Sequence, residues 1–245
     1  MIKRVGKRGD TLIEVMLAVG IFSMVAVAVV AVMSGGTSSA QTALETTLTR
    51  EEIDAQAEAL RFIQSSYIAE KDDKDGDFAK LWQLITGTGS GENKVNVVTS
   101  ESDIANIAQY SPTECAKLYE SEGEAKKYGF VINTRALGDS PDQAVISAGN
   151  QNRSGLFTQA STYPRLIYGG DGGVLTASGN NTLQGIEGIY IIAVKDPDST
   201  NITDKGKTSA YYDFYIRTCW YGTGDKTPST ISTVMRLYDP GIVNN

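Results

Sequence analysis

The sequence predicts an α+β protein in which a long N-terminal helix packs on a head with an antiparallel β-sheet. A helical pattern runs through residues 11–69, and the first proline is Pro112, so no helix breaker interrupts it. The strongest strand patterns come late in the chain, over 188–194, 211–221 and 230–238, and a Gly-rich hairpin loop joins the last two. Antiparallel strands that follow a long helix are typical of the α+β class.

The first part of this helix is apolar and almost free of charge. Residues 12–33 are Leu, Ile, Val, Ala, Met, Phe, Gly and Ser apart from one carboxylate, Glu14. At about 1.5 Å per residue, a helix of this length spans the ~30 Å hydrocarbon core of a bilayer. Burying an unpaired carboxylate there is costly, so we expect Glu14 to have a partner. The run follows four basic residues, which predicts a cytoplasmic N-terminal end: Lys3, Arg4, Lys7 and Arg8.

The basic leader ends at Gly9 and is followed by Asp10-Thr11-Leu12-Ile13-Glu14. This pattern resembles the start of type IV prepilins and pseudopilins. In that family a prepilin peptidase cuts after the leader glycine, the new N-terminus is usually methylated, and the fifth mature residue is a glutamate. The resemblance implies a cut between Gly9 and Asp10 and makes Glu14 the assembly charge, which pairs with the new amino group. Asp10 departs from the phenylalanine that is usual there and adds a second carboxylate beside the amine.

The resemblance also implies a division of the chain and a function. The division is a leader peptide at 1–9, a transmembrane and assembly half-helix at 10–35, an amphipathic half-helix at 36–69, and an extracellular head at 70–245. The function is that of a structural subunit of a type IV pilus or related filament, which serves adhesion, motility or DNA uptake. The subunit is first a single-pass protein of the cytoplasmic membrane and then part of the filament at the cell surface.

The partners implied by the resemblance are other pilin subunits, the prepilin peptidase and a membrane assembly platform. A head of about 175 residues is large for a repeating subunit, which favours a minor pilin over a major one. The choice between minor pilin, major pilin and pseudopilin stays open.

Other interpretations of the apolar run compete with this one. A secretory signal peptide would use a small-x-small site at 38–40 and release a chain that begins at Gln41. A signal anchor would remain uncut and tether a surface binding protein that does not assemble into filaments. A buried core helix is disfavoured because the run is apolar on all sides.

An apolar stripe predicts that the second half of the helix packs on the head. Between the two halves, 34–39 is rich in Gly and Ser, and each glycine costs a helix roughly 1 kcal/mol relative to alanine. We interpret this stretch as a flexible joint inside one helix, because the helical pattern resumes at once; a helix end followed by a linker is the alternative. The stripe consists of Leu44, Leu48, Ile53, Ala57, Leu60, Ile63 and Tyr67.

An acidic run follows the helix. Asp73, Asp75 and Asp77 alternate along the chain, and hard cations such as calcium take several carboxylates. The run departs from the standard calcium loop because Gly76 precedes the third acid and Phe78 follows it. A solvated turn is therefore the favoured interpretation, with a metal site at these three residues as the secondary one.

The remaining predicted elements of the head are short. The predicted regular elements are an amphipathic helix over 78–85 and strands over 95–98, 128–134 and 165–168. The other segments are an ambiguous helical pattern over 102–119, a loop over 138–162 and a glycine turn over 169–173.

The chain contains two cysteines, Cys115 and Cys219, both beyond the apolar run. Since this part of the chain is predicted to lie outside the membrane, where disulfides persist, we expect the two to be bonded rather than free. Closing a loop of about 100 residues stabilises a fold by about 4–5 kcal/mol in the chain-entropy model.

Composition argues against several functions. The sequence has no histidine and a formal net charge of −7. A lack of histidine removes the common general base and the usual transition-metal ligand, and an acidic surface disfavours nucleic acid. We therefore expect no enzymatic activity, no catalytic residue, no cofactor and no nucleic-acid partner. A late aromatic cluster is expected to pack the sheet rather than to stack on sugars; it comprises Tyr211, Tyr212, Tyr215, Trp220 and Tyr221.

Overall fold

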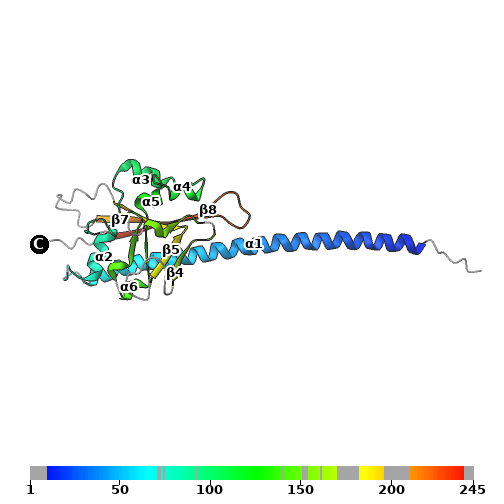
Figure 1. Cartoon of the computed structure of the whole chain (residues 1–245), viewed down its shortest axis with the longest axis horizontal. Coiled ribbons are helices and arrows are strands. Elements are labelled where there is room, and N and C mark those ends of the chain that lie inside the picture. Colours follow the sequence, from blue (N-terminus) through cyan, green and yellow to red (C-terminus); the bar gives the residue numbers. More distant parts are fainter. Residues whose placement is uncertain are drawn as a thin grey trace, which may run out of the picture. The chain divides into compact units, whose positions relative to one another are not determined.

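The computed structural model describes residues 10–70, 73, 75–91, 93–139, 141–150, 154–160, 162–169, 182–195 and 210–239. The chain divides into two compact units, residues 1–44 and 45–245. A single helix, α1 (Asp10–Ala69), contributes its first half to one unit and its second half to the other (Figure 1). The α+β class predicted from the sequence is confirmed.

Helix α1 is continuous over 60 residues. It passes through Gly35 and Gly36 without ending, so the interpretation as a helix end followed by a linker is wrong. The two glycines lie between an apolar and an amphipathic helical segment. Because helix formation is cooperative, the flanking helical turns keep the two glycines helical.

The head is built on a five-stranded antiparallel sheet in the order β2-β1-β6-β7-β8. Strands β7 and β8 pair over all 11 residues of each, as the predicted hairpin requires. The strands are β1 (Phe130–Ile132), β2 (Val145–Ser147), β6 (Ile189–Lys195), β7 (Ala210–Trp220) and β8 (Ser229–Asp239).

A second, three-stranded sheet has the order β3-β5-β4 and consists of β3 (Phe157–Thr158), β4 (Arg165–Gly169) and β5 (Thr182–Glu187). Gly188 joins β5 directly to β6 with a φ of +65°. A Cβ at this position would lie 2.7 Å from the Cys219 carbonyl oxygen, so both the backbone angle and the close approach require glycine. This turn sends the chain from the small sheet into the large one.

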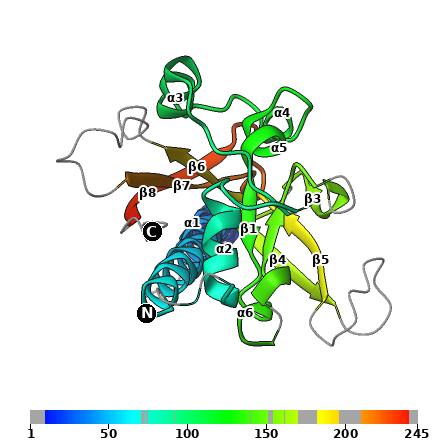
Figure 2. The same ribbon diagram turned by 90° about the vertical axis from the view of Figure 1, so that its left-hand side faces the viewer.

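Short helices cover both faces of the large sheet. Figure 2 shows α2 and the second half of α1 on one side of the sheet, and α3, α4 and α5 on the other. The helices are α2 (Asp77–Ile85), α3 (Glu101–Ala108), α4 (Cys115–Leu118), α5 (Glu124–Tyr128) and α6 (Ala136–Asp139), with 3₁₀ turns η1 (Pro141–Gln143) and η2 (Ser154–Leu156).

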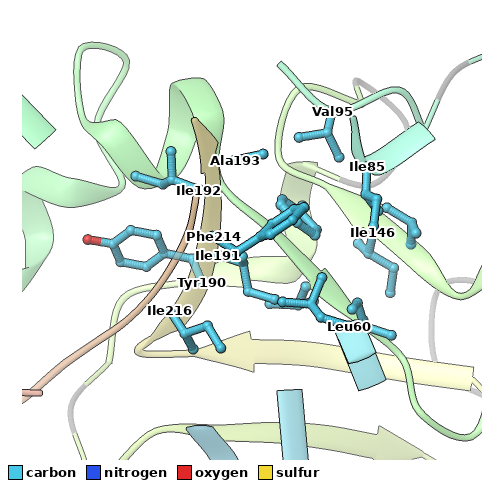
Figure 3. Packing of buried hydrophobic residues seen from close by; sticks show 14 of the residues in the cluster. Leu60, Ile85, Val95, Ile146, Tyr190, Ile191, Ile192, Ala193, Phe214 and Ile216 are labelled. Atoms are coloured by element: carbon cyan, nitrogen blue, oxygen red, sulfur yellow. The ribbon is translucent and has the colours of Figure 1, made fainter. Parts of the chain in front are cut away.

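The core lies between α1, α2 and the sheet. Leu60 of α1, Ile85 of α2 and Phe214 of β7 are all fully buried and converge there (Figure 3). Burying a side chain of this size contributes about 1.5–3 kcal/mol. The predicted stripe of α1 is buried from Ile53 to Tyr67, whereas Leu44 is 58% exposed, so the packed stripe is shorter than predicted.

A buried glutamine fastens α1 to the sheet. The Gln56 amide nitrogen donates to the Ile132 carbonyl oxygen at 3.0 Å, and the Ile132 N–H donates to the Gln56 amide oxygen at 2.9 Å. The antiparallel register that pairs Phe130 with Ile191 would bring Ile132 opposite Ile189, but the described ladder between β1 and β6 ends at Phe130. Gln56 therefore takes the place of the next strand residue and pairs the last backbone groups of β1.

Several predicted elements of the head differ from those observed. The loop predicted over 138–162 is wrong, because it contains β2, β3 and two 3₁₀ turns. Strand β5 was not predicted, and the strand predicted over 95–98 is reduced to a bridge between Val98 and Val194. The strand predicted over 128–134 begins after α5 and spans only β1. These strands are too short to show a period, and tertiary burial of a few side chains decides them.

Candidate functional site

The first half of α1 is exposed on every side within the described residues, as residues 12–44 show no buried position. Its large apolar side chains are 49–77% exposed. They are Leu12, Ile13, Val15, Met16, Leu17, Val19, Ile21, Phe22, Met24, Val25, Val27, Val29, Val30, Val32 and Met33. A helix that is apolar all round requires an apolar environment, either lipid or other helices.

Among the described residues, α1 is the one helix that is long and apolar enough to cross a bilayer, judged by length and composition. None of its most apolar window is buried within the chain, so the interpretation as a buried core helix is excluded. Signal sequences near an N-terminus meet the same two criteria, so a cleaved signal peptide remains a competing interpretation.

Glu14 lies at the start of the second turn of α1, within the apolar half. Its carboxylate forms no ion pair with any residue that the structure describes. Gly9 and the rest of the leader lie outside the described residues, and Asp10 is the first residue of the helix. The cut between Gly9 and Asp10 and the pairing of Glu14 therefore stay predictions.

Three hydroxyl groups of the exposed half-helix are satisfied within it. Ser23, Thr37 and Thr42 each donate to the carbonyl oxygen four residues earlier, at 2.7, 2.9 and 3.1 Å. A Cβ added at Gly35 or Gly36 would meet nothing within 4 Å. No described residue therefore requires glycine at these two positions, although each glycine costs the helix roughly 1 kcal/mol relative to alanine.

The acidic run after α1 has the geometry of an exposed turn. Asp73, Asp75 and Asp77 are all exposed, and the Asp75 N–H donates to an Asp73 carboxylate oxygen at 3.1 Å. Glu70 accepts a hydrogen bond from the Phe78 N–H at 3.1 Å and so caps α2, which lacks a cap from its own preceding residue. Among the described residues, no three Asp, Glu or Cys side chains lie close enough together to hold one metal ion.

The aromatic residues of β7 pack the sheet. Tyr212 and Trp220 are buried on the α1 side, where the Trp220 indole N–H donates to Glu45 at 3.3 Å. Tyr211, Tyr215 and Tyr221 are half-buried. The predicted packing role is confirmed for the two buried side chains.

Cys115 and Cys219 form the disulfide that the sequence favoured, with their Cα atoms 5.5 Å apart and a separation of 104 positions along the chain. Both cysteines are fully buried. The bond joins α4 to β7, and the Cys115 N–H also donates to the Tyr221 hydroxyl at 3.3 Å. The disulfide therefore fastens α4 directly to the end of β7.

A buried ion pair lies two residues from this bond. Arg217 is 1% exposed, and its guanidinium donates to both carboxylate oxygens of Glu124 at 2.7 and 2.8 Å and to the Ile107 carbonyl oxygen. Its guanidinium also lies 4.4 Å from the centre of the Tyr110 ring. The Tyr190 hydroxyl donates to Glu124 at 2.5 Å, and burial raises the pKa of Tyr190 well above its ordinary value. This network holds α3 and α5 on the sheet.

No sequence pattern predicts this network, because its charged partners Glu124 and Arg217 are 93 positions apart and no local pattern connects them. No protein-family model matches the chain, and neither a curated protein nor a solved structure is significantly similar to it. The class of protein that the structure itself defines is an α+β head on a long helix whose other half is exposed and apolar.

Proposed function

We propose that this protein is a prepilin that becomes a structural subunit of a type IV pilus or related extracellular filament. The chain is made with a basic leader, held in the cytoplasmic membrane by the first half of α1, and cut after Gly9. Subunits then join through this half-helix, and the head lies on the filament surface. The size of the head favours a minor pilin.

The observation that carries this proposal is an exposed apolar run over 12–33 that contains one carboxylate, Glu14, the fifth residue after Gly9. A simple membrane anchor does not need a carboxylate inside its apolar run, where burying an unpaired charge is unfavourable. Filament assembly supplies a use, because a new amino group at Asp10 of the same or a neighbouring chain neutralises Glu14 when the helices bundle.

The two glycines in the middle of α1 support helix bundling. Within one chain no side chain approaches Gly35 or Gly36. Small residues let the backbones of neighbouring helices come close where lipid or other helices surround them. Packing against α1 of other subunits gives these positions a role that the isolated chain lacks.

The cut is tested by determining the N-terminus of the mature protein from cells. Asp10 as the first residue supports the proposal, whereas Gln41 indicates a secretory signal peptide and Met1 an uncut anchor. Replacing Gly9 with a bulkier residue, as in Gly9→Val, is expected to block processing and leave a longer band on a gel. A change at Gly6, within the same leader, serves as the control and should leave the cut intact.

The role of Glu14 is tested by Glu14→Ala. This change should leave the cut intact and lower incorporation into sheared filaments at least tenfold. In this variant the new amino group at Asp10 has no carboxylate partner, and an unpaired charge in an apolar helix bundle costs about 2 kcal/mol or more. Each 1.4 kcal/mol lowers the association constant about tenfold. Glu51→Ala, an exposed glutamate in the second half of α1, is the matched control. Normal incorporation of the Glu14 variant would contradict the pairing.

A minor pilin differs from a major one in copy number. Quantitative mass spectrometry of purified filaments, which counts this chain per filament length, is expected to find it far below one copy per subunit position. A count near one per position would make it the major subunit instead.

A further inference from the structure

Strand β8 leaves an unpaired backbone edge on the large sheet. It is the last strand in the order β2-β1-β6-β7-β8, and its partner β7 lies on one side only. The Tyr238 carbonyl oxygen points away from β7, because it accepts a hydrogen bond from the Gln64 amide at 2.7 Å. In an antiparallel ladder alternate residues share this direction, so the backbone groups of Thr230, Ser232, Val234 and Arg236 also point outward.

No described residue pairs with these outward groups between Thr230 and Arg236. Natural sheets commonly protect such an edge by making it short, bulged, or interrupted by lysine or proline. The opposite edge follows that rule, since β2 has only three residues. Strand β8 does not: it pairs with β7 in unbroken register over 11 residues, and it contains neither lysine nor proline.

The exposed side chains of β8 also favour a contact along this strand. Val234 is 51% exposed and Tyr238 is 54% exposed, and they project from one face of the strand because they are four residues apart. Residues 229–235 carry no charge and are rich in β-branched side chains, a composition that favours strand pairing.

We propose that β8 is a docking edge for β8 of a second copy of this chain, in antiparallel pairing with Val234 opposite Val234 of the copy. This register places Ser232 opposite Arg236 and Thr230 opposite Tyr238, so that outward backbone groups meet outward groups. Val234 is then covered by its equivalent at the two-fold axis. No like charges lie opposite each other, which is the complementarity that a self-pairing strand requires.

The neighbouring registers are worse for specific reasons. A two-fold axis at Ser232 would place Arg236 opposite Pro228, which has no N–H to donate. An axis at Arg236 would place two guanidinium groups directly opposite each other, and this destabilises a strand pair. Of the three axes at the outward residues Ser232, Val234 and Arg236, the one at Val234 gives a continuous ladder without like-charge contact.

The pairing also fixes how the two copies approach. Glu45 of α1 accepts hydrogen bonds from Trp220 and Thr223 at the hairpin end, while Gln64 reaches Tyr238 at the other end. Residues 45–64 therefore run in the same direction as β8, and an antiparallel β8 pair sets these helix segments antiparallel. The strand pairing itself does not depend on the filament function proposed above.

Cysteine cross-linking of the full chain in detergent micelles tests the register. In an H-bonded antiparallel pair the Cα atoms lie about 5.5 Å apart, which a disulfide bridges, so Val234→Cys should cross-link to its copy under mild oxidation. Ser232→Cys is the matched control, because its two equivalents would lie about 13 Å apart along the strands. The native cysteines are already bonded and buried, so they do not interfere.

A charge at the axis tests the same contact without cysteine. Val234→Lys should abolish the β8-linked dimer in native mass spectrometry, whereas Phe62→Lys, at another exposed apolar site on α1, should retain it. Both variants are checked for folding by thermal unfolding, and Val234 is exposed enough to tolerate lysine. Equal cross-linking of the two cysteine variants, or a dimer unchanged by Val234→Lys, overturns the proposal, even if the chain associates through its apolar helix.

Discussion

Removing the Gln56 amide is expected to destabilise the packing of α1 on the sheet strongly. In Gln56→Leu the side chain keeps its size, but the Ile132 N–H and carbonyl oxygen both lose their partner in a fully buried place. Each unsatisfied buried group costs about 1–3 kcal/mol, so the free energy of unfolding should fall by about 2–5 kcal/mol. For a domain of this size that corresponds to a melting temperature lower by about 5–15 °C.

The assay is thermal unfolding of the full chain in detergent, followed by tryptophan fluorescence, since Trp82 and Trp220 are buried beside α1. Gln64→Leu is the matched control: its amide is exposed and makes one bond to Tyr238, so its melting temperature should stay within about 2 °C of the parent. A Gln56→Leu variant that melts with the parent, or a control that loses as much, would refute the reasoning.

Three other changes give expected outcomes by the same thermal assay. Replacing Cys115 and Cys219 with serine should lower the free energy of unfolding by about 4–5 kcal/mol, and reductant should then have no further effect. Arg217→Met leaves the partly buried Glu124 carboxylate without its cation and should cost about 2–3 kcal/mol, less than the loss of one partner of a fully buried pair. Adding Glu124→Gln should restore part of that loss, and strict additivity would argue against the pair. Burial raises the pKa of the Glu52 carboxyl above its ordinary value, so the ionised carboxylate destabilises the folded state at neutral pH. Glu52→Gln should therefore raise the melting temperature at pH 7. This gain should vanish below about pH 4, where the Glu52 carboxyl is protonated in both the folded and the unfolded state. A gain that persists in acid would contradict the burial argument.

Sequence patterns predicted the helices and strands whose periodic pattern extends over many neighbouring residues. The extent of α1, the helix at 77–85 and the β7–β8 hairpin each repeat a period over many residues. The pattern at 145–147 spans only three residues within a polar segment, and it becomes a strand because Val145 and Ile146 are buried against neighbours far along the chain. A three-residue run shows no period, so the sequence predicted a loop there.

Some features of the candidate site are likewise visible in the sequence, and others only in the tertiary structure. The apolar half of α1, the carboxylate at Glu14 within its apolar run and the two cysteines are visible in the sequence, because composition and residue order are properties of the chain itself. Only the tertiary structure decided that Gln56 completes a strand and that Arg217 meets Glu124, since these contacts join residues 76 and 93 positions apart. Periodicity reports which face a residue occupies within its own element, whereas partner choice across the fold depends on how whole elements pack.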